Sequence, residues 1–534
     1  MFTPKPKIIT WAVIGIAVCL TLISKTHLAV SAPVRTIVFI SDLHMGLGKN
    51  ADGEWFETED FRWPKAFKGF LNHISAIGNE AVDLVIVGDF LELWQPPAHV
   101  ACKGPNKNYG CNISEISDTA RAVIAGHQDE LKDLAKFAQT GNNCVHVIPG
   151  NHDSALVIDS VWSLLAEALE SQSGCVEIAK NGTWSSQDGS VVAEHGHQIG
   201  WDRNRYGEWP LITKDIDGII YLRRPWGENF VQRIFNRVEA NDTIIDNLSP
   251  LSAGALYRYK GSQAETKVKD IARLILFNLL ETSMSQKISL LGEHDEIEEP
   301  PKWDVKAARS MGSQLFAGAL APGSAVSNAI SDTGTEGADI RAALKALANN
   351  QQQMSDNAIL SLCDQLAARK SKYKPEERVR MCPTLDPPVL GSLIEQLVSS
   401  RKRVVSPYVE ELWSKQLNMR TFVYGHTHAF EKKWPVKISS RVCVNVINDG
   451  AFQRVINDEK FRGLAESKNI TPSQALNDLG PESLPACYTF AKVFKLPSGE
   501  IIRELKAWHM KEDGEGRAID VCDSRCADVG KECN

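Results

Sequence analysis

The sequence has no strong excess of charge of either sign. Its 59 Lys and Arg residues nearly balance 66 Asp and Glu residues, which gives a formal net charge of -7. Proteins that bind a nucleic-acid backbone usually carry a clear basic excess, so we expect no nucleic-acid partner and disfavour a nuclease. A local basic pocket for one phosphate group remains compatible with this charge. The chain also lacks an internal repeat, and its length indicates two domains or one heavily inserted domain.

Only the N-terminus looks like a targeting segment. Lys5 and Lys7 precede an apolar run from Ile8 to Ile23, and small residues follow. A basic start, an apolar stretch and a small-residue end are typical of a secretory signal. The run is shorter than the roughly 20 apolar residues that a membrane span needs. Because Pro33 follows the best cleavage site, a signal peptide and an uncleaved signal anchor both stay open for residues 1–32.

Export changes the interpretation of the twelve cysteines. In an oxidising compartment several of them should pair. Cys102 and Cys111 bracket a polar loop and predict a local disulfide. Three more cysteines crowd the C-terminal tail, residues 511–534, and predict local disulfides there, with a zinc knuckle as the alternative; they are Cys522, Cys526 and Cys533. Cys144 and Cys443 lie in apolar runs and are expected to be buried thiols.

Five short apolar runs rich in Val and Ile each end in a polar cluster. Their length and their apolar character on both faces are typical of buried strands. The runs are 35–40, 82–87, 144–148, 191–193 and 419–423. Helical patterns separate the first three, at roughly 61–77 and 114–140, so the chain begins as a βαβ unit. In such sheets ligands gather at the carboxyl ends of the strands, which is where every polar cluster stands.

The polar clusters supply seven side chains that are suited to metal binding. Carboxylate, imidazole and amide oxygen are ligands for borderline divalent ions such as manganese, iron and zinc. The seven residues are Asp42, His44, Asp89, Asn151, His195, His426 and His428. One ion needs only about four to six donors, so seven donors with one bridging carboxylate suit two ions.

The spacing within these clusters also supports a shared site. In an extended segment the side chains at i and i+2 point the same way, so Asp42 and His44 should reach one ion, as should His426 and His428. Glycines at 88, 150, 196 and 425 remove side chains where the backbone turns close to the site. His197 could exchange roles with His195, which we favour as the ligand.

The rest of the chain changes character. Residues 203–417 show long helical patterns, for example at 338–349 and 352–370, and are expected to form a helical insertion. Strand-like runs follow at 441–447, 488–496 and 500–508 and are expected to build a second sheet. The core would therefore consist of residues 33–202 together with 418–510.

The motifs resemble those of calcineurin-like metallophosphoesterases. Asp42-x-His44, Gly88-Asp89, Gly150-Asn151-His152-Asp153, the His195 cluster and Gly425-His426-x-His428 carry this resemblance. It implies an α/β (α+β) fold, a four-layer αββα sandwich of two mixed sheets flanked by helices. It also implies that Asp42, His44 and His428 hold one ion, that Asn151, His195 and His426 hold the other, and that Asp89 bridges them. Within the family, residues 88–94 and His195-Gly196 look most like the UDP-2,3-diacylglucosamine hydrolase branch.

The donor set predicts a mechanism. Two divalent ions, with manganese favoured, would generate hydroxide from a shared water near neutral pH. This hydroxide would hydrolyse a phosphomonoester, a phosphodiester or a pyrophosphate. His152 is expected to stabilise or protonate the leaving group, with Asp153 fixing its tautomer and orientation.

Two questions about function stay open at this stage. The substrate is expected to be a phosphorylated small molecule or a lipid-linked phosphate, and membrane association would come from the N-terminus of an exported, membrane-anchored or periplasmic or extracellular protein. The alternative to an enzyme is a metal-stabilised scaffold whose site is idle and whose insertion binds a partner.

Overall fold

The computed structural model of the protein describes residues 35–200, 204–249, 253–254, 257–258, 402–511, 515–526 and 529. The N-terminal segment expected to be a signal lies outside these residues, as do the helices expected at 338–349 and 352–370. Within the part of the chain that is described, no helix is both long enough and apolar enough to span a membrane.

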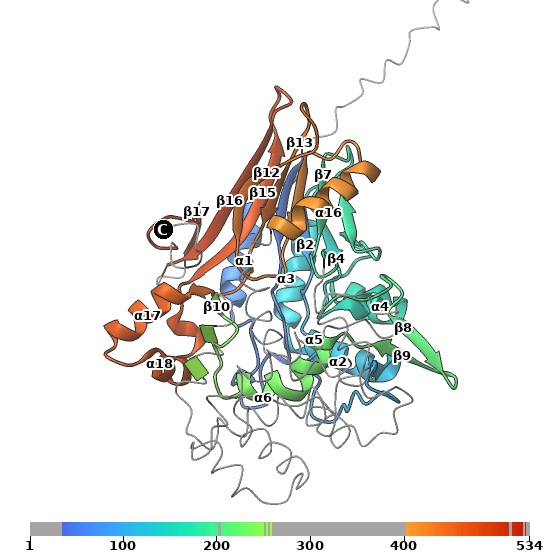
Figure 1. Ribbon diagram of the computed structural model, residues 1–534, viewed down its shortest axis with the longest axis vertical. Coiled ribbons are helices and arrows are strands. Elements are labelled where there is room, and N and C mark those ends of the chain that lie inside the picture. Colours follow the sequence, from blue (N-terminus) through green and yellow to red (C-terminus); the bar gives the residue numbers. More distant parts are fainter. Residues whose placement is uncertain are drawn as a thin grey trace, which may run out of the picture. The chain divides into compact units, whose positions relative to one another are not determined.

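A mixed seven-stranded sheet forms the first half of the core (Figure 1). Its strand order is β17-β16-β15-β1-β2-β4-β5. The strands are β1 (Thr36–Ile40), β2 (Val82–Val87), β4 (Cys144–Ile148), β5 (Cys175–Ile178), β15 (Cys487–Lys495), β16 (Ile501–Met510) and β17 (Gly516–Asp520). β1 pairs in parallel with β2, Val38 opposite Leu84, and antiparallel with β15, Val38 opposite Lys492. The predicted βαβ beginning is therefore confirmed.

A second, five-stranded sheet has the order β12-β13-β11-β7-β6. Its strands are β6 (Thr183–Ser185), β7 (Val191–Glu194), β11 (Thr421–Tyr424), β12 (Glu431–Lys437) and β13 (Cys443–Asn448). β7 and β11 are parallel neighbours, with Val423 opposite Ala193. This pairing joins the fourth and fifth polar clusters of the sequence at one end of the sheet, although more than two hundred residues separate them.

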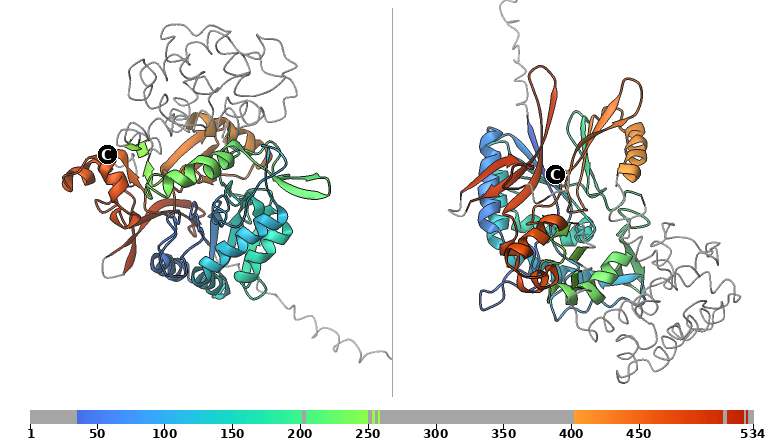
Figure 2. Two further views of the ribbon diagram at one scale, coloured as in Figure 1. Left: turned by 90° about the horizontal axis from the view of Figure 1, so that it is seen from below. Right: turned by 60° about the vertical axis from the view of Figure 1, so that its left-hand side comes forward.

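Helices cover the outer faces of both sheets, and apolar side chains fill the space between the sheets. The helices on the first sheet are α1 (Pro64–Ile77), α2 (Ile113–Gly126), α3 (Gln128–Gln139) and α4 (Asp159–Ala168). Along β1, Val38 and Ile40 pack with these helices, whereas Phe39 packs with Val423 of the second sheet. The helix α16 (Lys402–Lys415) packs against the other face of the second sheet through Val405. Figure 2 shows α1 and α16 on opposite sides of the strands, and the four-layer αββα expectation is confirmed.

The prediction for the C-terminal strands was partly wrong. β13 joins the second sheet, but β15 and β16 extend the first sheet beside β1. Both faces of β15 are apolar, because Phe490 packs with the helices and Val493 packs between the sheets. Such a pattern identifies a buried strand, but it does not specify which long-range partner that strand will take.

The described beginning of the 203–417 segment contains strands as well as helices. β8 (Thr213–Ile216) and β9 (Ile219–Arg223) form a hairpin that pairs with β3 (Tyr109–Asn112). Short helical segments follow, α5 (Trp226–Phe230), η2 (Val231–Phe235) and α6 (Asn236–Glu239), and β10 (Leu248–Ser249) pairs with β14 (Ile456–Asn457). The C-terminal helices α17 (Asp458–Ser467) and α18 (Pro472–Asp478) pack with this segment around Ile245. This part of the segment is therefore built into the core.

Three disulfides lie among the described residues. Cys102–Cys111 confirms the predicted local disulfide. Cys144 bonds Cys175 across β4 and β5, and Cys526 bonds Cys487 of β15. The expectations of a buried Cys144 thiol and of a purely local tail were wrong, because sequence spacing does not show which cysteines the sheet brings together. Cys443 is a free thiol but is exposed rather than buried. Disulfides of this number are typical of an oxidising environment outside the cytosol.

Candidate metal centre

The seven predicted ligands converge at one end of the two sheets. β1, β2 and β4 of the first sheet end just before Asp42, Asp89 and Asn151, and β7 and β11 of the second sheet end just before His195 and His426. All seven side chains are buried or nearly so. The carboxyl ends of parallel strands from both sheets thus supply the site.

The backbone at five of these residues has the left-handed conformation. The φ angles are 52° at Asp42, 48° at His44, 48° at Asp89, 74° at His426 and 55° at His428. The expectation that Asp42-x-His44 and His426-x-His428 are extended was wrong. Left-handed non-glycine residues carry conformational strain and cluster at functional sites. The tight turns, and not strand geometry, aim each pair at a common point.

Two glycines make room for this packing, as the sequence suggested. A Cβ atom on Gly150 would lie 2.2 Å from Oδ1 of Asp89. A Cβ atom on Gly425 would lie 2.3 Å from Oγ of Ser41 and 2.8 Å from Oδ2 of Asp42. Any side chain at either position would displace a carboxylate of the site.

One group of donors consists of Asp42, His44 and His428. Nε2 of His44 lies 3.2 Å from Nε2 of His428, and Oδ1 of Asp42 lies 3.5 Å from the latter atom. This Oδ1 is buried and has no hydrogen-bond partner. Ligand atoms of the three residues lie within 4.8 Å of one another, as donors around one metal ion would.

A second group consists of Asp89, His195 and His426. Nε2 of His195 lies 3.0 Å from Oδ2 of Asp89, 3.0 Å from Oδ1 of Asn151 and 3.2 Å from Nδ1 of His426. Oδ2 of Asp89 also lies 3.8 Å from Nε2 of His44. Asp89 therefore lies between the two groups, in the position that a bridging ligand requires.

The ring hydrogen bonds leave Nε2 of two histidines facing the pocket. Nδ1 of His195 donates to the carbonyl of Val87 at 2.7 Å, and Nδ1 of His44 donates to Glu92 at 3.0 Å. Ligand histidines commonly use their second nitrogen in this way. Burial works to lower the pKa of His195, but Asp89 and Asp42 raise it to about 10. The pocket therefore attracts positive charge strongly.

His152 lies at the edge of this pocket. Its backbone N–H donates to Oδ1 of Asp89 at 2.8 Å, and its Nδ1 lies 2.5 Å from Oε2 of Glu92. The imidazole stacks on Trp94 with ring centroids 3.9 Å apart. The same Oε2 receives the hydrogen bond of His44, and Oε1 accepts the N–H of Trp94 at 2.7 Å. Burial works to raise the pKa of Glu92, but His152 and His44 lower it to about 2.

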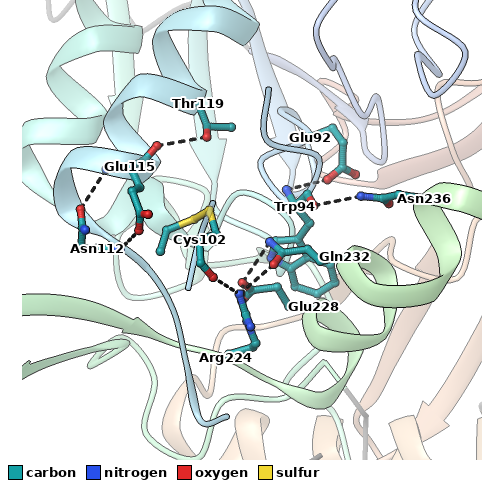
Figure 3. The surroundings of a disulfide bond; sticks show 11 residues. Glu92, Trp94, Cys102, Asn112, Glu115, Thr119, Arg224, Glu228, Gln232 and Asn236 are labelled. Atoms are coloured by element: carbon teal, nitrogen blue, oxygen red, sulfur yellow. Dashed lines mark hydrogen bonds and ion pairs between the residues drawn. A yellow bond between two sulfur atoms is a disulfide. The ribbon is translucent and has the colours of Figure 1, made fainter. Parts of the chain in front are cut away.

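The candidate site residues named from the sequence did not include Glu92 and Trp94, although both contact His152. The signal was available, because Glu92 follows Asp89 by three residues in the turn after β2. Figure 3 shows Glu92 beside Trp94, with Asn236 donating to the carbonyl of Trp94 at 3.4 Å.

Asp153 does not orient His152, so that part of the prediction was wrong. Its Oδ1 accepts the N–H of Gly150 at 2.6 Å, and its Oδ2 accepts the N–H groups of Phe90 and Leu91 at 2.9 and 3.3 Å. Burial, followed by repulsion from Asp89, raises the pKa of Asp153 to about 6. Asp153 therefore links the turn after β4 to the turn after β2. The carboxylate that contacts Nδ1 of His152 is that of Glu92 and not that of Asp153. His197 is buried next to His195, with ring centroids 5.5 Å apart.

Comparison with known families agrees with this geometry. The family described as Calcineurin-like phosphoesterase matches residues 35–277. This match supports the metallophosphoesterase family. The matched range contains Asp42, Asp89, Asn151 and His195, whereas His426 and His428 follow it in the sequence. No curated protein matches the chain.

The residues present fit the divalent metals that metallophosphoesterases use. The donors are imidazole nitrogens and carboxylate and amide oxygens, the set that suits manganese, iron or zinc. The Oδ1 atom of Asp42, buried without a hydrogen-bond donor, would otherwise be an unsatisfied acceptor. The chain thus has the features of a metal-dependent phosphoesterase.

Proposed function

We propose that this protein is an exported dinuclear metal-dependent phosphoesterase that hydrolyses a phosphomonoester, a phosphodiester or a pyrophosphate. The observation that carries the proposal is the position of Asp89 between two groups of metal-binding side chains, Asp42/His44/His428 and His195/His426 with Asn151. Two divalent ions bound there would activate water and neutralise charge on the phosphoryl oxygens. Manganese is the metal that we favour.

The protein's own residues supply positioning and proton transfer. Glu92 holds Nδ1 of both His44 and His152, which leaves Nε2 of His152 free to give a proton to the leaving oxygen. Stacking on Trp94 fixes the ring plane.

Replacing Asp89 by Asn tests the proposal. Asn keeps the shape of the side chain but removes the charge that two ions would share, so kcat should fall at least about a thousandfold. Elemental analysis should find fewer than the two manganese ions per chain that we expect in the wild type. The surface replacement Asp118→Asn is the matched control and should leave turnover unchanged.

An idle metal-binding scaffold is the alternative function. Under that alternative, Asp89→Asn would change thermal stability alone, and the wild-type protein would hydrolyse no member of a phosphate-ester panel. Every predicted ligand is present in the site, which favours the enzyme.

The same panel addresses the substrate. Residues 88–94 resemble the UDP-2,3-diacylglucosamine hydrolase branch, so the panel should include a UDP-linked diacyl sugar in detergent beside soluble chromogenic esters. We expect faster turnover of detergent-dispersed lipid phosphates, in keeping with an exported protein that is membrane-associated through its N-terminus. Equal rates on a soluble ester would argue for a small phosphorylated molecule instead.

A further inference from the structure

A sixth polar turn lies at the same end of the sheets as the candidate metal centre. β13 pairs in parallel with β11, with Asn448 opposite Tyr424, so both strands end at the same edge. The turn after β13 consists of residues 448–453, here called the β13 turn, and all six residues are buried. None of the seven predicted metal ligands belongs to it. Its polar groups instead contact two turns that carry such ligands.

The first of these is the Asp42 turn, residues 41–44. Oγ of Ser41 donates to Oδ1 of Asp449 at 2.9 Å and to the carbonyl of Gly450 at 2.8 Å, a three-centre arrangement. The backbone N–H of Phe452 donates to the carbonyl of Ser41 at 2.8 Å. The residue before Asp42 is therefore held at its side chain and at its backbone.

The β13 turn also reaches the residue after Asp42. Nε2 of Gln453 donates to the carbonyl of Leu43 at 3.2 Å. Asp42 itself has a φ angle of 52°, a strained conformation for a residue other than glycine. Hydrogen bonds to both of its neighbours hold it in that conformation.

The second is the His426 turn, residues 425–428. Nδ2 of Asn448 donates to Oγ1 of Thr427 at 2.7 Å, and Oδ1 of Asn448 accepts the N–H of Gly450 at 2.9 Å. Because that N–H can only donate, it fixes which end of the amide faces Thr427. The hydroxyl hydrogen of Thr427 goes to the carbonyl two residues further along the chain. Thr427 stands between His426 and His428, so this contact fixes the turn that carries both imidazoles.

The β13 turn joins the two sheets at this edge. It begins at the end of β13 in the second sheet. Oγ1 of Thr489, in β15 of the first sheet, accepts the N–H of Ala451 at 3.0 Å and donates to the carbonyl of Ala451 at 3.0 Å. The Asp42 turn follows β1 of the first sheet and the His426 turn follows β11 of the second. The β13 turn therefore sets the position of one ligand turn relative to the other.

We propose that two residues of the β13 turn, Asn448 and Asp449, are positioning residues that raise the metal affinity of the centre without binding a metal themselves. Asp449 acts through Ser41. Asn448 acts through Thr427. The inference rests on the proposed function, because it takes the two groups of donors to bind one ion each.

The two contacts should act on different ions. Asp42 belongs to the first group of donors alone, whereas His426 belongs to the second group and His428 to the first. The Asp449 contact therefore supports one ion, and the Asn448 contact supports both. A role in stability alone would not produce this division.

Manganese titration of the purified full-length chain, followed by calorimetry, tests the proposal. The wild type should bind two ions. Ser41→Ala removes the hydroxyl that contacts Asp449 and should weaken one binding step about tenfold, whereas Thr427→Val removes the acceptor of Asn448 and should weaken both steps about tenfold. Asn477→Ala, an exposed asparagine in α18, is the matched control and should leave both steps unchanged.

Replacements of Asp449 separate positioning from direct binding. Asp449→Asn keeps an acceptor oxygen for Ser41 and should retain both affinities, whereas Asp449→Ala should reproduce the loss seen in Ser41→Ala. Circular dichroism should show a native fold in each variant before its titration is compared.

Two results would overturn the inference and leave the proposed function intact. One is unchanged manganese affinity in both Ser41→Ala and Thr427→Val together with a lower melting temperature, which would make the contacts purely structural. The other is a larger loss of affinity in Asp449→Asn than in Ser41→Ala, which would make Asp449 a metal ligand. A wild-type chain that bound fewer than two manganese ions would overturn the proposed function, and this inference with it.

Discussion

Two buried clusters in this protein combine histidine and glutamate in opposite ratios. At the candidate metal centre, Glu92 lies between His44 and His152. Under the loop that follows His44, His127 lies between Glu59 and Glu130, at 3.3 and 3.6 Å. Glu92 leaves Nε2 of each histidine available to the pocket. Both nitrogens of His127 instead face carboxylates, so that cluster has no atom left for a ligand.

This difference indicates that the first cluster serves the reaction and that the second stabilises the local structure. Glu59 also accepts the N–H groups of Gly46, Gly48 and Phe61, which shapes the loop after His44. The carboxylate of the first cluster orients groups that would meet a metal or a substrate, and the carboxylates of the second orient backbone. The same substitution should therefore have different consequences in the two clusters.

Glu92→Gln should have the largest effect. A glutamine has only one acceptor oxygen. If that oxygen takes the place of Oε2, the amide NH2 faces the N–H of Trp94; if it takes the place of Oε1, the hydrogen bonds from His44 and His152 are lost. We expect kcat to fall about a thousandfold and metal affinity to weaken about 10–100-fold. Steady-state kinetics with metal titration measures both. Glu130→Gln, the same replacement in the other cluster, should leave kcat within about twofold; a large loss of kcat there would remove the distinction.

His152→Asn should have a smaller effect, confined to proton transfer. The amide of Asn still donates to Glu92 from near the position of Nδ1, so His44 keeps its orientation and metal content stays the same. The loss of Nε2 should lower kcat about a hundredfold. Substrates whose leaving groups are already acidic should lose much less. If all substrates lost activity equally, His152 would be a positioning residue.

His127→Gln should affect stability and not activity. Burial works to lower the pKa of His127, but Glu130 and Glu59 raise it to about 9. Because folding raises this pKa, the stabilisation is complete below about pH 6.5, the ordinary histidine value, and is lost as pH rises through about 9. It amounts to on the order of 3 kcal/mol.

Denaturant unfolding at several pH values measures this difference. The free energy of unfolding of wild type should exceed that of His127→Gln most at pH 6, and the gap should narrow toward pH 10. A gap that stayed constant with pH would mean that His127 is neutral in the folded protein.

The sequence predicted the sheet strands and all seven converging side chains because each follows a Val- and Ile-rich run at a strand end. It did not predict their backbone. Asp42 and His44 were expected in an extended segment, yet both are left-handed, a conformation that favours glycine and that only tertiary packing imposes. Glu92 was missed because its partner His152 lies 60 residues away in the sequence. Asp153 was misassigned for the opposite reason, since adjacency to His152 suggested a contact that the turn does not make.

The position of β15 and β11 late in the chain has a consequence for synthesis. β1, β2 and β4 leave the ribosome early, but β1 stays an open edge until β15 at 487–495 pairs with it, and His426 and His428 arrive only shortly before. Vectorial folding from the N-terminus therefore cannot finish either sheet. Completion of the first sheet would therefore have to wait for β15, and metal capture would have to wait for His426 and His428.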